Sequence, residues 1–116
     1  MNNTIATINH IPTSADDIQV GDIFYTSKTY NSTLVTFYQV ISRTKKTFTV
    51  KEMKEERKWD DRFGSTGTSI PTTTLKDREY KAKIHKDGST KLTFRGFCGR
   101  ETAYPWDGSA KYISND

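Results

Sequence analysis

The sequence predicts an all-β fold, a small antiparallel barrel for which an SH3-like arrangement is one candidate. Short runs rich in threonine, other β-branched residues and aromatic residues alternate with tight-turn residues along the chain, a pattern typical of strands. Helix signals are thin by comparison. A closed barrel also pairs the edges that a threonine-rich sheet would otherwise expose to aggregation.

The first three strands are expected in the N-terminal half. Residues 23–26 follow a turn at Gly21 and Asp22, where glycine supplies the permissive dihedral angles. Residues 34–42 form the most apolar run and carry apolar residues on both faces, which predicts a central strand covered on both sides. Residues 47–53 alternate and are expected to pair back antiparallel.

The fourth and fifth strands, residues 80–85 and 90–97, are expected to form a hairpin. Asp87–Gly88 between them is the strongest local hairpin signal, because glycine accepts the positive φ of a two-residue type I′ turn. Residues 55–77 lack periodicity and are predicted to be a long loop. The chain after residue 97 is predicted to be irregular and pinned by aromatic side chains.

One domain is expected, because the chain has 116 residues. Residues 1–14, which include His10, are rich in asparagine and threonine and are predicted to be a polar tail before a single β domain of residues 15–113. No apolar run approaches the length of a membrane span, and no secretory signal is visible. Cys98 is the single cysteine and cannot form an internal disulfide. A cytoplasmic protein with no membrane partner is the expectation.

Four short segments occur in a distinctive order along the chain. They are Val-Gly-Asp-Ile-Phe at 20–24, Thr-Phe-Tyr-Gln-Val at 36–40, Lys-Thr-Phe-Thr-Val at 46–50 and Ala-Tyr-Pro-Trp-Asp-Gly at 103–108. In this order they resemble a group of small phage and prophage proteins. The resemblance implies a phage-type accessory protein with a small β-barrel, located in the cytoplasm of a bacterial host, and it implies no catalytic residue.

The sequence offers little for catalysis or metal binding. The two histidines and one cysteine show no C-x-x-C or H-x-x-H spacing, so no metal site and no cofactor are expected. The adjacent pairs Glu55–Glu56 and Asp60–Asp61 would point to opposite faces of a strand, which disfavours an acid–base pair. Cys98 is expected to be a small core residue. A non-enzymatic protein is therefore expected.

The predicted hairpin gathers positive charge on one face. The chain carries 18 Lys and Arg against 14 Asp and Glu, a formal net charge of +4. Apolar residues in the hairpin alternate with basic ones, so pairing across a two-residue turn would place the basic ones together. Such a face is either merely solvated or follows a phosphate backbone. The predicted nucleic-acid-binding residues are Lys81, Lys83, Lys86, Lys91 and Arg95.

The charged start of the predicted loop indicates a different kind of partner. Its aromatic residues either pin the loop to the core or form a protein interface, where Trp, Tyr and Arg dominate. The predicted protein-interface residues are Trp59, Asp60, Asp61, Arg62 and Phe63.

Three functions therefore stay open at the level of the sequence. The favoured one is a binding module that engages nucleic acid through the basic hairpin. The first alternative is an anti-CRISPR-like inhibitor of a bacterial defence protein, whose partner would be a host protein that handles nucleic acid. The second alternative is a virion or assembly component. No oligomeric state is predicted.

Overall fold

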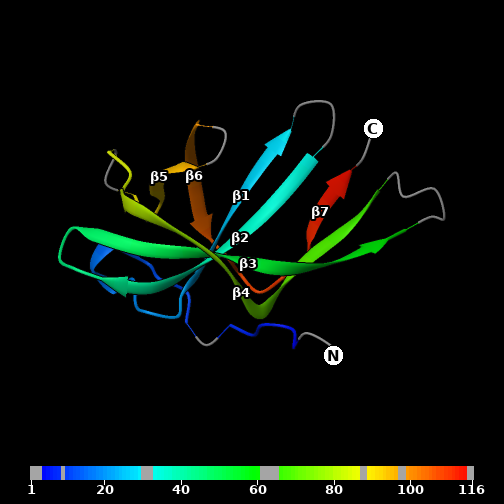
Figure 1. The fold of residues 1–116 in the computed structure, drawn as a ribbon, viewed down its shortest axis with the longest axis horizontal. Helices are drawn as coiled ribbons and strands as arrows, with labels where there is room; N and C mark the ends of the chain where they lie inside the picture. The colour runs from blue at the N-terminus through cyan, green and yellow to red at the C-terminus, as the bar shows by residue number, and fades with distance from the viewer. Residues whose placement is uncertain are drawn as a thin grey trace.

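In the part of the chain that it describes, the computed structural model contains seven β-strands and one short 3₁₀ helix, which confirms the all-β class (Figure 1). The structure describes residues 4–8, 10–29, 33–60, 66–86, 89–96 and 99–114. Within these ranges, no helix is long and apolar enough to cross a membrane. The elements are η1 (Ala15–Asp17), β1 (Ile23–Thr29), β2 (Thr33–Arg43), β3 (Thr47–Trp59), β4 (Thr66–Ile84), β5 (Leu92–Gly96), β6 (Gly99–Pro105) and β7 (Lys111–Ser114).

The strands form one antiparallel sheet whose hydrogen bonds close into a ring, as the sequence predicts. Six strands follow each other in the order β1-β6-β5-β4-β3-β2, and β1 then pairs with β2 from Ile23↔Gln39 to Thr29↔Thr33. β7 lies outside this ring and bridges the beginnings of β2 and β4, through Thr33↔Ser114 and Thr66↔Ser114. Closure gives the sheet an inner and an outer face.

β2 is the central strand that its apolar run predicts, because it contributes to a core on each face. Val40 points into the barrel, and Phe37 points to the outer face, where its ring lies 5.8 Å from that of Trp106. We call the inner cluster the barrel core; it contains Ile18, Phe24, Tyr38, Val40, Phe48, Val50, Ala82, Leu92, Phe94 and Ala103. The outer core contains Ala6, Ile23, Val35, Phe37, Met53, Trp106 and Ile113.

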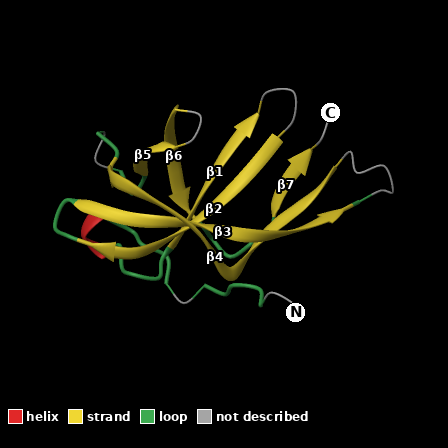
Figure 2. Cartoon of the chain, viewed as in Figure 1, coloured by secondary structure: helices red, strands yellow, loops and turns green. Residues whose placement is uncertain are grey.

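The short helix η1 closes one end of the barrel. Figure 2 shows η1 in red, beside the β2–β3 turn. Ile18 directly follows η1 and is buried in the barrel core. Arg43, at the end of β2, donates a hydrogen bond to the Ile18 carbonyl, and its guanidinium lies 4.6 Å from the centre of the Phe48 ring. The arginine thereby fastens the helix to the sheet.

The prediction of a long loop over residues 55–77 is wrong. β3 continues to Trp59 and β4 begins at Thr66, and the two pair from Glu55↔Pro71 to Trp59↔Gly67. Register shifts on either side of Met53 interrupt the pairing and therefore the alternation that would reveal a strand. This paired part of β3 and β4, from Glu55↔Pro71 to Trp59↔Gly67, is called the β3–β4 ribbon. It extends to one end of the molecule (Figure 1), where both of its faces can carry polar residues.

The prediction of an irregular chain after residue 97 is also wrong, because β6 and β7 lie there. β6 pairs with β5 on one side and with β1 on the other. The aromatic anchor expected in this part of the chain is Trp106, which lies between β6 and β7. Trp106 is 1% exposed and donates a hydrogen bond from Nε1 to the Ser109 carbonyl at 2.7 Å.

β4 and β5 form the predicted hairpin. The residues of its predicted two-residue turn, Asp87 and Gly88, lie outside the described ranges. Ile84 pairs with Leu92, and Lys83 pairs with Thr93. This register places the apolar side chains of the two strands on one face of the hairpin and Lys83 on the other.

Residues 4–8 and 10–14, which belong to the segment predicted as a polar tail, lie along the sheet. The Ala6 N–H donates to the Pro71 carbonyl at 2.9 Å, and the Thr73 N–H donates to the Thr4 carbonyl at 2.8 Å. Ala6 is buried in the outer core. The segment therefore covers part of β4 as an added backbone strand would.

Replacing a leucine of the barrel core should cost far more stability than replacing an exposed one. Leu92 is 0% exposed and Leu34 is 49% exposed. Leu92→Ala leaves a cavity and should lower the free energy of unfolding by about 2–5 kcal/mol, whereas Leu34→Ala should cost less than about 1 kcal/mol. Urea denaturation measures both. Equal losses would contradict the assignment of Leu92 to a closed core.

Candidate nucleic-acid interface

The outer face of β4 and β5 carries basic side chains. Lys81 and Lys83 flank Ala82, which is completely buried in the barrel core, so both lysines point outward. Arg95 follows the buried Phe94 on β5 and points outward too. All three basic residues are exposed. The folded chain thus places three of the five predicted nucleic-acid-binding residues on one face.

The lysines on β4 differ in what they contact. Lys81 lies opposite Thr49 of β3 and donates a hydrogen bond from Nζ to its hydroxyl at 2.7 Å. Thr49 is buried, so Lys81 covers this part of the sheet with its own side chain. Lys83 lies between Thr47 on β3 and Thr93 on β5. Neutral neighbours on both sides leave the charge of Lys83 at the surface.

Arg100 on β6 adds a cation that the sequence analysis missed. It is exposed, and it lies directly opposite Arg95. Its Nη1 donates a hydrogen bond to the Thr93 hydroxyl at 3.0 Å, which holds the guanidinium over β5. Like charges directly opposite each other destabilise a sheet, so the pairing of Arg95 with Arg100 does not contribute to the stability of the fold.

Lys86 and Lys91 lie at the margins of this face. Lys86 is exposed in the segment after β4. Lys91 directs its Nζ toward the outward-facing Tyr104 on β6, 5.6 Å from the ring centre. The outward row Lys81, Lys83, Arg95 and Arg100, with Lys86 and Lys91 at its margins, is called the basic face below.

A hollow of about 400 Å³ opens within the basic face. Its lining comes from β4, the segment after β4, β5 and β6, and no acidic residue occurs among the described residues that line it. Glu101 on β6 points the other way, toward the barrel, and forms an ion pair with Lys28 at 2.6 Å. The lining residues are Lys83, Ile84, His85, Lys86, Thr93, Arg100 and Thr102.

Two residues of the predicted protein interface, Trp59 and Asp60, lie at the end of the β3–β4 ribbon. Trp59 ends β3 and is 36% exposed. Asp60 follows it, donates its N–H to the Thr66 carbonyl at 2.8 Å and accepts the Thr66 hydroxyl at 3.4 Å. The other predicted residues, Asp61, Arg62 and Phe63, lie outside the described residues.

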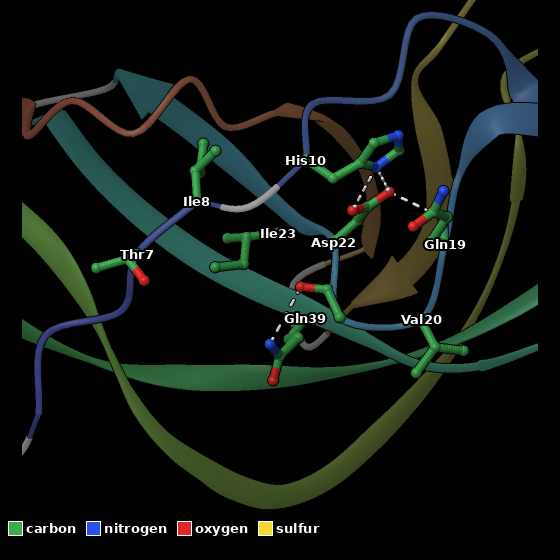
Figure 3. A pocket seen from close by; sticks show the side chains of 9 residues that line it. Thr7, Ile8, His10, Gln19, Val20, Asp22, Ile23 and Gln39 are labelled. Carbon is green, nitrogen blue, oxygen red and sulfur yellow. Dashed lines mark hydrogen bonds and ion pairs between the residues drawn. The ribbon is translucent and has the colours of Figure 1, made fainter.

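A histidine held by two carboxylates forms a further polar cluster, which the sequence analysis also missed. His10 Nδ1 lies 2.9 and 3.0 Å from the two oxygens of Asp22, and Nε2 lies 3.2 Å from Asp17 Oδ1. Asp22 is 4% exposed and also accepts the Gln19 N–H at 2.8 Å. Figure 3 shows the imidazole pointing at Asp22, beside a hollow of about 210 Å³.

We call this cluster of His10, Asp17 and Asp22 the His10 clamp, because the histidine side chain joins two separate parts of the chain. Both ring nitrogens face carboxylates, and both can donate only when the imidazole is protonated. Hydrogen bonds to Asp22 and Asp17 raise the pKa of His10 above its ordinary 6.5, against the opposing effect of burial. Hydrogen bonds from Thr13 and His10 lower the pKa of Asp17 below its ordinary 3.8. His10 thereby ties the N-terminal segment to η1 and to the start of β1.

In the described part of the chain, no group of three or more His, Cys, Asp or Glu side chains is arranged to hold a metal ion. No protein-family model, no curated protein and no solved structure matches this chain. The resemblance to phage proteins stays a prediction.

The clamp should make stability depend on pH. The raised pKa of His10 means that its contribution is full below pH 6.5 and is lost as the pH rises through the raised value. The lowered pKa of Asp17 means that its contribution is full above pH 3.8 and is lost as the pH falls through the lowered value.

His10→Gln should therefore reduce the free energy of unfolding most between these two limits. Urea denaturation of the natural chain and the variant at about pH 5 and about pH 9 measures the difference. A difference that stays the same at both pH values would contradict a charged clamp.

Proposed function

We propose that this chain is a non-enzymatic binding module that engages nucleic acid through its basic face. The observation that carries the proposal is the row of cations over β4, β5 and β6. In the described parts of these strands from Lys81 onward, Glu101 is the one acidic residue, and it points toward the barrel. An uninterrupted row of this kind fits a phosphate backbone.

The energetics of the face also favour a polyanionic partner. Arg95 and Arg100 lie directly opposite each other on neighbouring strands, a position in which like charges destabilise a sheet. A phosphate between or above them replaces repulsion with attraction, and the net charge of +4 adds long-range steering toward such a partner.

A protein partner is the second candidate, and the exposed Trp59 favours it. A partly exposed tryptophan beside charged residues is the type of side chain that dominates protein interfaces. Trp59 lies at the end of β3, paired with Gly67 at the beginning of β4. This position suits an inhibitor of a bacterial defence protein that binds through the ribbon end.

Nucleic-acid affinity should fall steeply as salt is added. Fluorescence anisotropy with a labelled oligonucleotide measures the Kd over a series of salt concentrations. Each phosphate contact contributes about 0.7–0.9 to the slope of log Kd against log salt, so Lys83→Ala should weaken binding and lower the slope by about that amount. Lys58→Ala, which removes the same charge from the exposed part of the β3–β4 ribbon, should change neither. Undetectable binding at low salt would contradict the proposal.

Trp59→Ala should leave nucleic-acid affinity unchanged, because Trp59 lies on the ribbon and not on the basic face. The same anisotropy assay tests this, with a thermal melt to show that the variant is folded. Loss of affinity would move the nucleic-acid surface to the ribbon end. If nucleic acid does not bind at all, retention of a purified partner by the natural chain but not by the variant would support the second candidate.

A further inference from the structure

The hollow in the basic face has the donors that a phosphate group requires. Lys83 on β4 and Arg100 on β6 contribute charge to this hollow, and Thr93 on β5 and Thr102 on β6 contribute hydroxyl groups to its lining. Charge-assisted hydrogen bonds from such groups to phosphate oxygens are the strongest that side chains make. Among the described lining residues nothing competes as an anion.

Arg100 is positioned in this hollow before any ligand arrives. One of its N–H groups is used on the Thr93 hydroxyl at 3.0 Å. A guanidinium has five donors in a rigid plane, so the group is oriented while donors remain for a ligand. Orientation in advance lowers the entropy that binding would otherwise cost.

An exposed aromatic ring lies next to the hollow. Tyr104 follows Thr102 by two residues on β6, so both side chains point to the same outer face. Its ring is 41% exposed and packs beside Tyr25, with the ring centres 6.0 Å apart. Lys91 lies 5.6 Å from the same ring centre. Tyr104 is thus a supported aromatic surface with a cation beside it.

The spacing of Thr102 and Tyr104 on β6 places the hollow and the aromatic ring of Tyr104 in one site. Residues two apart on a strand are about 7 Å apart, which is close to the length of one extended nucleotide. We infer that the basic face binds single-stranded nucleic acid, with a phosphate in the hollow at Arg100 and Thr102 and the neighbouring base stacked on Tyr104. This inference rests on the proposed function and names its substrate class.

A duplex would use the same surface less well. Its phosphates can meet the cations, but its bases are stacked on each other and paired, so none can reach Tyr104. Stacking of unpaired bases on aromatic side chains, next to a basic groove, is how proteins hold single strands without reading their sequence.

The test compares a labelled oligothymidylate with a duplex of the same length by fluorescence anisotropy. The natural chain should bind the single strand more tightly. Tyr104→Ala should weaken single-strand binding about tenfold, as expected for the loss of one stacked base, and should leave duplex binding and the salt slope unchanged. Tyr104→Phe keeps the ring and should restore the affinity. Arg100→Ala should weaken both ligands and lower the salt slope by about 0.7–0.9.

The outcomes separate this inference from the proposed function. Equal binding of single strand and duplex, with no effect of Tyr104→Ala, overturns the inference while the loss caused by Lys83→Ala still supports the basic face. Equal weakening of both ligands by Tyr104→Ala also overturns it, because the ring then acts through the fold. Absence of binding to either ligand overturns both. A thermal melt of each variant shows that it is folded.

Discussion

The pairing of β1 with β2 is the constraint on which the rest of the structure depends. Hydrogen bonds along all of β1, from Ile23↔Gln39 to Thr29↔Thr33, turn an open sheet into a ring. Only a closed sheet has an inside, and the inside fixes which side chains on every other strand face outward. Lys83 and Arg100 share a surface because Ala82 and Ala103 fill the barrel core.

The parts of the fold that could be predicted are those in which local pattern and tertiary packing agree. In β2, Val40 belongs to one core and Phe37 to the other, so an apolar run on both faces indicates its central place. In β4 the alternation around Ala82 predicts which side the lysines take. The register of β4 against β5, with Ile84 opposite Leu92, brings the apolar side chains of the two strands to the same face.

Other elements could not be predicted, because the residues that stabilise them lie elsewhere in the sequence. β6 carries Glu101 at an inward position, which hides the strand pattern, and the charge is tolerated because Lys28 from β1 reaches it at 2.6 Å. Because the sequence pattern does not predict β6, it also does not predict that Arg100 and Tyr104 point outward from that strand. The His10 clamp likewise joins Asp17 and Asp22 through the path of the chain, and no spacing motif indicates it.

Closure of the ring of strands also limits how early the chain can complete its fold. β1 meets β6 through Phe24↔Pro105 and Tyr25↔Tyr104, contacts between segments far apart in the chain. Contacts of such high sequence separation slow folding, because a large loop must close before they form. On a ribosome, β1 and β2 emerge early and must wait for β6 to be synthesised. Until then the edge of β1 that pairs with β6 in the folded chain stays unpaired, and an unpaired strand edge is a template for association with other chains.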